Sequence, residues 1–167
     1  MSKKRILFVC MGNICRSPAA EAVMKKMIAN EKLSKLIEVD SAGIIDYHKG
    51  ETADPRIIRT ALKRGYKIDS VSRQFDMDSD FENFDYIVAM DNENFDDILA
   101  LDMDNKYHDK VLKFTDFLEK YQQEEIPDPY YNGIKGFELV LELIEDASKG
   151  LLKKVKDDIQ KENQTKD

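Results

Sequence analysis

The chain has 167 residues, of which 42% are hydrophobic and 35% charged, a composition typical of one soluble globular domain with its own core. Its formal net charge of −7 argues against nucleic acid as the main partner, because phosphate backbones are bound by basic surfaces. No segment is long and apolar enough for a membrane span or a secretory signal, and only two cysteines are present, so we expect a cytoplasmic protein without disulfides.

The first predicted elements are a buried strand at Ile6–Val9 and the loop that follows it. The run is short and apolar and ends in a β-branched residue, which is typical of a strand covered on both faces. Cys10 comes next and Arg16 follows six positions later, with Gly12 and Asn13, which both tolerate positive φ, between them. A loop whose N–H groups point inward binds a tetrahedral oxyanion and, together with the arginine, favours a cysteine thiolate. The spacing therefore predicts a phosphate-binding loop with its own nucleophile, although taken alone it also fits a small core cysteine.

A helix is predicted to begin directly after this loop. Ser17 is a preferred N-cap residue, Pro18 fits the first helical position, and Glu21 places negative charge in the opening turn. The positive end of such a helix points at the loop and adds to its affinity for anions. Cys15 lies inside the loop, where it is either a core residue or a redox partner of Cys10.

Strand patterns alternate with helical patterns along the rest of the chain. Strands are predicted at Ile37–Val39, Tyr86–Met90 and Lys110–Phe114, and helices at Pro55–Arg64 and Glu93–Leu101. A last helix is marked by apolar residues at helical spacing, namely Phe137, Val140, Leu141, Ile144, Ala147 and Leu151. The alternation indicates an α/β fold with a parallel sheet and helices on both faces. The polar residues from about Lys156 onward are expected to fray, so we place the domain at residues 1–158 and a polar tail at 159–167.

A second candidate catalytic residue lies far along the chain. Asp128 stands between Pro127 and Pro129, which prevent a helix and hold the carboxyl group on a loop, where it can be presented to a bound ester. The tripeptide alone is more typical of a turn aspartate. The two histidines, His48 and His108, have no neighbours typical of a metal site, and we expect both at the surface and no bound metal.

The segments VCMGNICRSP, at Val9–Pro18, and PDPYYNG, at Pro127–Gly133, resemble the two signatures of the low-molecular-weight protein tyrosine phosphatases. Asp40–Gly43 and Phe84–Asp91 also resemble the family in the expected order, and the likeness covers roughly residues 4–158. The resemblance implies a four-stranded parallel sheet of flavodoxin-like winding, also described as a Rossmann-like phosphotyrosine phosphatase I fold. It further implies hydrolysis of phosphotyrosine in proteins, and of small aryl phosphates, without a metal or other cofactor.

The resemblance also implies a role for each matched residue. Cys10 would be the nucleophile, Arg16 would bind the phosphate, and Asp128 would act as general acid and then general base. Ser17 would stabilise the Cys10 thiolate as a leaving group, and the Asn13 side chain would hold the loop. The backbone amides of Met11, Gly12, Asn13, Ile14, Cys15 and Arg16 would bind phosphate or other oxyanions, and Tyr47, Tyr130, Tyr131 and Ile14 would contact the substrate's ring.

One position departs from the family and several alternatives stay open. Ser70 stands where many members have a histidine that supports the loop asparagine, so the sequence leaves the rigidity of the loop, and with it the turnover, undecided. Phosphoarginine phosphatases carry threonine at the position of Ile14 and lack the tyrosine pair after the acid. Arsenate reductases of this fold need further cysteines beyond Cys15, which this chain lacks. A non-catalytic phosphotyrosine-binding module is the alternative from a different class.

Overall fold

Four parallel strands form the centre of the computed structural model, which describes residues 3–129 and 133–165. They are β1 (Lys4–Cys10), β2 (Ile37–Gly43), β3 (Tyr86–Ala89) and β4 (Val111–Lys113), in the order β2-β1-β3-β4. The predicted four-stranded parallel sheet is confirmed. The predicted phosphate-binding loop follows β1, one of the two central strands, at the carboxyl edge where sheets of this kind bind ligands.

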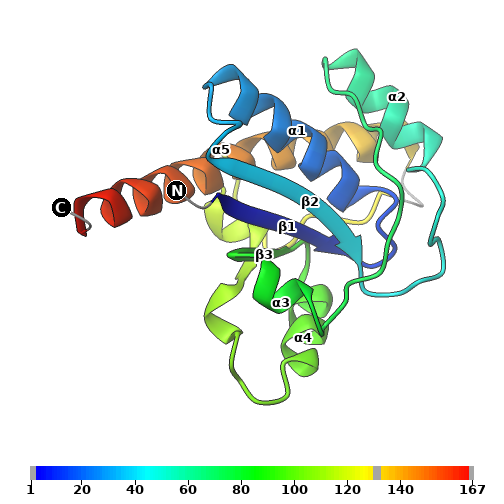
Figure 1. Cartoon of the computed structure of the whole chain (residues 1–167). Coiled ribbons are helices and arrows are strands. Elements are labelled where there is room, and N and C mark those ends of the chain that lie inside the picture. Colours follow the sequence, from blue (N-terminus) through cyan, green and yellow to red (C-terminus); the bar gives the residue numbers. More distant parts are fainter. Residues whose placement is uncertain (1–2, 130–132, 166–167) are drawn as a thin grey trace.

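Helices cover both faces of this sheet, as predicted (Figure 1). On one face lie α1 (Arg16–Asn30), α2 (Pro55–Lys63) and α5 (Gly133–Thr165), and on the other α3 (Asp80–Asn83) and α4 (Asn92–Leu101). Two single-turn 3₁₀ helices, η1 (His108–Lys110) and η2 (Phe114–Phe117), flank β4. None of the described helices combines the length and the apolar character of a membrane span.

The side chains of β1 alternate between the two halves of the core. Ile6, Phe8 and Cys10 belong to the cluster under α1, α2 and α5, whereas Leu7 and Val9 belong to the cluster under α3 and α4. All five are buried, which explains why the strand appears in the sequence as an uninterrupted apolar run. The alternation brings the sulfur of Cys10 to the same face of the sheet as the first turn of α1.

The start of α1 differs from our prediction. The helix begins at Arg16, so Ser17 is its second residue and makes no cap hydrogen bond, and Glu21 lies beyond the first turn. Ser17 does not cap the helix because its hydroxyl is turned toward Cys10 and Asn13. Glu21 is buried and accepts a hydrogen bond from Ser41, which explains its place in the interior.

Two elements are longer than predicted. Strand β2 continues through Gly43 because its polar Ser41 is buried against other polar groups rather than exposed. Helix α5 does not fray near Lys156 but continues to Thr165. Val155 and Ile159, four residues apart, extend the apolar stripe onto the core, and Asp158 accepts a hydrogen bond of 2.6 Å from the Tyr86 hydroxyl.

Candidate active site

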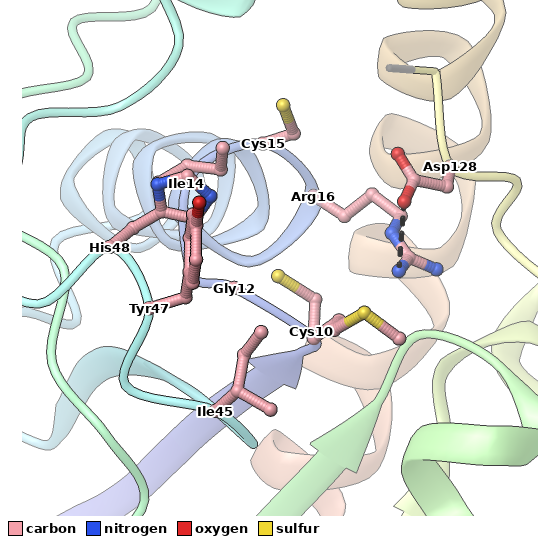
Figure 2. Close-up of a pocket in the computed structure, with 10 residues that line it drawn as sticks. Cys10, Gly12, Ile14, Cys15, Arg16, Ile45, Tyr47, His48 and Asp128 are labelled. Atoms are coloured by element: carbon pink, nitrogen blue, oxygen red, sulfur yellow. Dashed lines mark ion pairs between the residues drawn. The ribbon is translucent and has the colours of Figure 1, made fainter. Parts of the chain in front are cut away.

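A cavity of about 340 Å³ opens at the carboxyl end of β1 (Figure 2). The residues that line it come from three parts of the chain: Cys10, Met11, Gly12, Ile14, Cys15 and Arg16 from the loop, Ile45, Tyr47 and His48 from the segment after β2, and Asp128. The structure therefore brings the three predicted catalytic side chains, Cys10, Arg16 and Asp128, to one cavity. It also adds Ile45 and His48, which sequence reasoning did not find.

The sulfur of Cys10 lies at the floor of the cavity, at the end of a buried strand and beside the first turn of α1. Its Sγ atom is 3.0 Å from the Ser17 hydroxyl, the contact expected if that hydroxyl stabilises a thiolate. The positive end of the α1 dipole and the nearby Arg16 guanidinium favour negative charge at the same place.

The phosphate loop, residues 10–16, is shaped by Asn13. This residue has a φ of 57°, in the left-handed region, whereas Gly12 does not need positive φ, contrary to our expectation for both residues. The buried Asn13 amide donates to the hydroxyls of Ser17 (2.8 Å) and Ser41 (2.9 Å) and accepts from the Arg73 backbone N–H (3.0 Å). These three bonds offset the strain of the left-handed backbone, which costs on the order of 1–2 kcal/mol.

Support for the loop does not come from Ser70. Its hydroxyl makes no hydrogen bond with another described residue, and Asn13 is held by Ser17, Ser41 and Arg73 instead. Ser41 belongs to the Asp40–Gly43 segment that resembles the family, so that segment was a sequence signal for this network. The contact with Arg73 uses its backbone, which no side-chain pattern reveals.

Arg16 is held rigidly for its proposed contact with phosphate. Its side chain is 4% exposed, and Nη1 donates to the Asp91 carboxylate at 2.6 Å and to the Ile126 carbonyl at 3.0 Å. Burial lowers the pKa of the Arg16 guanidinium. The nearby Cys10 and the hydrogen bond to Asp91 outweigh this effect and raise the pKa above its ordinary value. Sequence reasoning gave no role to Asp91, although it ends the FDYIVAMD segment, two residues after β3.

Asp128 stands at the mouth of the cavity, on the side of Arg16 (Figure 2). Its side chain is 51% exposed, and one carboxylate oxygen lies 3.9 Å from Nη2 of Arg16. The preceding Ile126 is fixed by its N–H, which donates to the Met90 carbonyl at 2.9 Å. The loop is thus anchored just before a carboxyl group that remains accessible to a ligand.

The opposite wall is built by the segment after β2. Tyr47 is 80% exposed and packs edge-to-face on His48, with the ring centroids 5.0 Å apart. His48 is not the plain surface residue that we expected, because it lines the cavity and its Nδ1 lies 2.7 Å from a Glu51 carboxylate oxygen. His108 lies outside the cavity and contacts Asp102 in the same way. The predicted ring contacts Tyr130 and Tyr131 fall outside the described residues.

Cys15 lines the cavity from within the loop but differs from Cys10 in its surroundings. Burial, followed by the negative charge of Asp54, raises the pKa of the Cys15 thiol well above its ordinary value. In Figure 2 the sulfur of Cys15 points away from that of Cys10. A disulfide between the two therefore requires the loop to rearrange.

Comparison with known proteins agrees with this geometry. The family model described as low molecular weight phosphotyrosine protein phosphatase matches residues 5–161. A low molecular weight protein-tyrosine-phosphatase of Streptomyces coelicolor is 40% identical over 158 residues, covering 93% of this chain and 96% of that one. A crystal structure of a protein tyrosine phosphatase from Entamoeba histolytica, with Hepes in its active site, is 47% identical and has a TM-score of 0.88, covering 93% of this chain and 98% of that chain.

A Drosophila arginine phosphatase is also similar in structure, with 30% identity and a TM-score of 0.82, covering 89% of this chain and 95% of that chain. The match to the family model nevertheless spans nearly the whole sequence. The chain therefore belongs to the low molecular weight phosphotyrosine protein phosphatase family, a family of protein-tyrosine phosphatase hydrolases.

Proposed function

We propose that the protein hydrolyses phosphotyrosine in proteins, and small aryl phosphates, through a cysteinyl-phosphate intermediate. The observation that supports this most strongly is the meeting of Cys10, Arg16 and Asp128 around one cavity with an aromatic side chain at its rim. A binding module that only docks phosphotyrosine needs the loop and the arginine, but it does not need an accessible carboxyl group beside them.

In the first step the Cys10 thiolate attacks phosphorus, an S–P bond forms, and the bond between phosphorus and the tyrosine oxygen breaks. The proton that the leaving phenolate requires comes from Asp128, which is accessible at the mouth of the cavity. Arg16 and the amides of residues 11–16 bind the equatorial oxygens throughout the transfer. The buried ion pair with Asp91 keeps the guanidinium aimed at the loop.

In the second step a water molecule attacks the phosphorus of the Cys10 phosphoenzyme. Asp128, now ionised, accepts the proton of the water, the S–P bond breaks, and inorganic phosphate is released. The Ser17 hydroxyl, 3.0 Å from the sulfur, donates to the departing thiolate and makes it a better leaving group. No step requires a cofactor.

The test compares variants at the two ends of this mechanism. Cys10→Ser should abolish turnover of p-nitrophenyl phosphate in a protein that remains folded, because a serine hydroxyl does not ionise in the same field. Asp128→Ala should lower the rate on phosphotyrosine by about 10²- to 10⁴-fold, and by less on esters whose leaving group needs no proton. Glu124→Ala, an exposed acid in the same loop, is the matched control. Full activity of Cys10→Ser would end the proposal.

Phosphoarginine is the second candidate substrate, because an arginine phosphatase is among the similar structures. Ile14 lines the cavity, and its methyl groups pack on an aromatic ring better than on a planar, polar guanidinium group. A phosphotyrosyl peptide should therefore be hydrolysed clearly faster than the matched phosphoarginyl peptide. Replacing Ile14 by threonine should move the ratio toward phosphoarginine, by a factor that corresponds to about 1–3 kcal/mol.

A further inference from the structure

One hydroxyl outside the proposed chemistry holds the phosphate loop from behind. Ser72 is buried, at 5% exposure, and its Oγ donates to the carbonyl of Gly12 at 2.9 Å. Gly12 is the second residue after the nucleophile and itself lines the cavity. The hydrogen bond therefore acts on the part of the loop where a bound phosphate would lie.

The geometry of the peptide bond gives this contact a consequence inside the cavity. The carbonyl of Gly12 and the N–H of Asn13 belong to one rigid, planar trans unit, so they point in opposite directions. A hydroxyl that holds the carbonyl outward also holds the Asn13 N–H inward. The side-chain bonds of Asn13 hold its left-handed backbone, and the Ser72 hydroxyl adds a contact that fixes the preceding peptide unit.

Ser72 also connects the loop to the opposite wall of the cavity. Its carbonyl accepts from the Gly50 N–H at 2.9 Å, and its N–H donates to the Glu51 carbonyl at 2.8 Å. These bonds fix the turn that carries His48, whose ring is so close to Gly12 that a Cβ there would lie 3.0 Å from Cδ2. Ser72 thus adds to the direct bonds between the two walls, in which the N–H groups of Ile44 and Ile45 donate to the carbonyls of Cys10 and Met11, each at 3.0 Å.

The segment that carries Ser72 is itself firmly anchored. The guanidinium of the next residue, Arg73, is bonded to the carboxylates of Asp80 (2.9 Å) and Asp40 (3.0 Å). Asp40 belongs to β2, an edge strand of the sheet, and Asp80 belongs to α3, on the face opposite α1. Arg73 therefore connects the segment to both elements. A hydroxyl presented from such a segment has a fixed position.

We propose that Ser72 is a positioning residue of the phosphate site, which keeps the Asn13 amide N–H aimed at the bound phosphoryl group by holding the Gly12 carbonyl outward. This role rests on the proposed function, in which the loop binds the phosphoryl oxygens. It is specific to the Ser72 hydroxyl and is not shared by Ser70 on the same segment, whose hydroxyl makes no hydrogen bond with another described residue.

The test compares Ser72→Ala with the matched control Ser70→Ala, using inorganic phosphate and vanadate as probes. Phosphate affinity measured by calorimetry should fall by about 10-fold in Ser72→Ala, since losing alignment of one donor costs less than deleting an oxyanion donor outright. Ser70→Ala should stay within about 2-fold of the parent, and Ser72→Thr, which keeps the hydroxyl, should recover most of the affinity. In the phosphate-bound proteins, exchange of the Asn13 amide hydrogen should accelerate in Ser72→Ala alone.

The readouts separate this role from a general loss of stability and from the proposed function. A variant that lowers only the melting temperature, with unchanged phosphate affinity in the folded state, overturns the role. Equal phosphate affinities of Ser72→Ala and Ser70→Ala overturn the role as well. If Ser72→Ala does not fold, the Ser72→Thr protein decides, and the role is overturned if that protein binds phosphate more weakly than the parent. Phosphate binding by the parent protein does not require turnover, so absence of hydrolysis would contradict the proposed function without deciding the role of Ser72.

Discussion

The two cysteines of the phosphate loop differ in a way that decides how oxidant acts on them. Peroxide attacks thiolates, and the raised pKa of Cys15 keeps that residue a thiol, so we expect Cys10 to be oxidised first, to a sulfenic acid. The Cys15 sulfur can then attack the oxidised sulfur, releasing water and closing a disulfide. Because the two sulfurs point apart, this capture requires movement of the loop (Figure 2).

We therefore predict that mild peroxide inactivates the protein reversibly and that Cys15→Ser is inactivated as well but recovers poorly with thiol reductant. Without capture, the sulfenic acid of Cys10 advances to forms that reductants do not reverse. Activity before and after reduction, with mass spectrometry of the oxidised peptides, measures the outcome. Equal recovery of both proteins and no peptide linking Cys10 to Cys15 would discard the redox role and leave the phosphatase function standing.

At the scale of elements, Asp91 joins the start of α4 to the phosphate site. Its Oδ1 caps α4 by accepting from the Asn94 N–H at 2.7 Å, while Oδ2 binds Arg16. Asp91→Asn retains a good N-cap residue but loses the charge that orients the guanidinium. We expect kcat/KM to fall by about 10- to 100-fold, with unfolding free energy changed by about 1 kcal/mol or less. Loss of activity in proportion to loss of folded protein would assign Asp91 a structural role alone.

Helix α5 approaches η2 so closely that only glycine fits at the contact. A Cβ at Gly150 would lie 2.1 Å from the Phe117 carbonyl oxygen, which belongs to the backbone and cannot rotate away. Gly150→Ala should therefore destabilise the protein by about 1–3 kcal/mol, because the helix must shift. Denaturant unfolding checks this, with Lys149→Ala, at the neighbouring exposed position, as control. A Gly150→Ala protein as stable as the control would show that η2 yields easily.

Elements with a local cause could be predicted from the residues, whereas contacts between distant elements could be predicted only where the family resemblance supplied them, as for Asp128. The apolar run of β1 and the spacing of apolar residues in α5 depend only on neighbouring residues, and both elements are confirmed. The predicted start of α1 was wrong because the Ser17 hydroxyl contacts Cys10 and Asn13 instead of capping the helix. Ser72 and Asp91 reach the site across 60 and 75 positions of the chain, a separation that no local pattern encodes.

At the scale of the whole molecule, a chain with net charge −7 is proposed to act on an anionic group. The two facts are compatible because the groups that attract the anion are buried and act over a short range. Arg16, the helix terminus and the loop amides surround the floor of one cavity, where solvent ions screen them little. The net negative charge acts instead over the longer distance at which a substrate approaches.

Salt should consequently change the relative kcat/KM of acidic and basic phosphopeptides more than it changes the rate of the chemical step. Between about 0.01 and 0.15 M sodium chloride the Debye length shrinks from about 30 to about 8 Å, which removes long-range repulsion but hardly reaches the cavity. We predict that kcat/KM rises severalfold with salt for a phosphotyrosyl peptide with acidic neighbours and falls for the matched peptide with lysine neighbours. Chloride is the required anion, because sulfate or phosphate would occupy the loop. Parallel responses of the two peptides would mean that the field at the cavity, rather than the net charge of the molecule, governs the encounter.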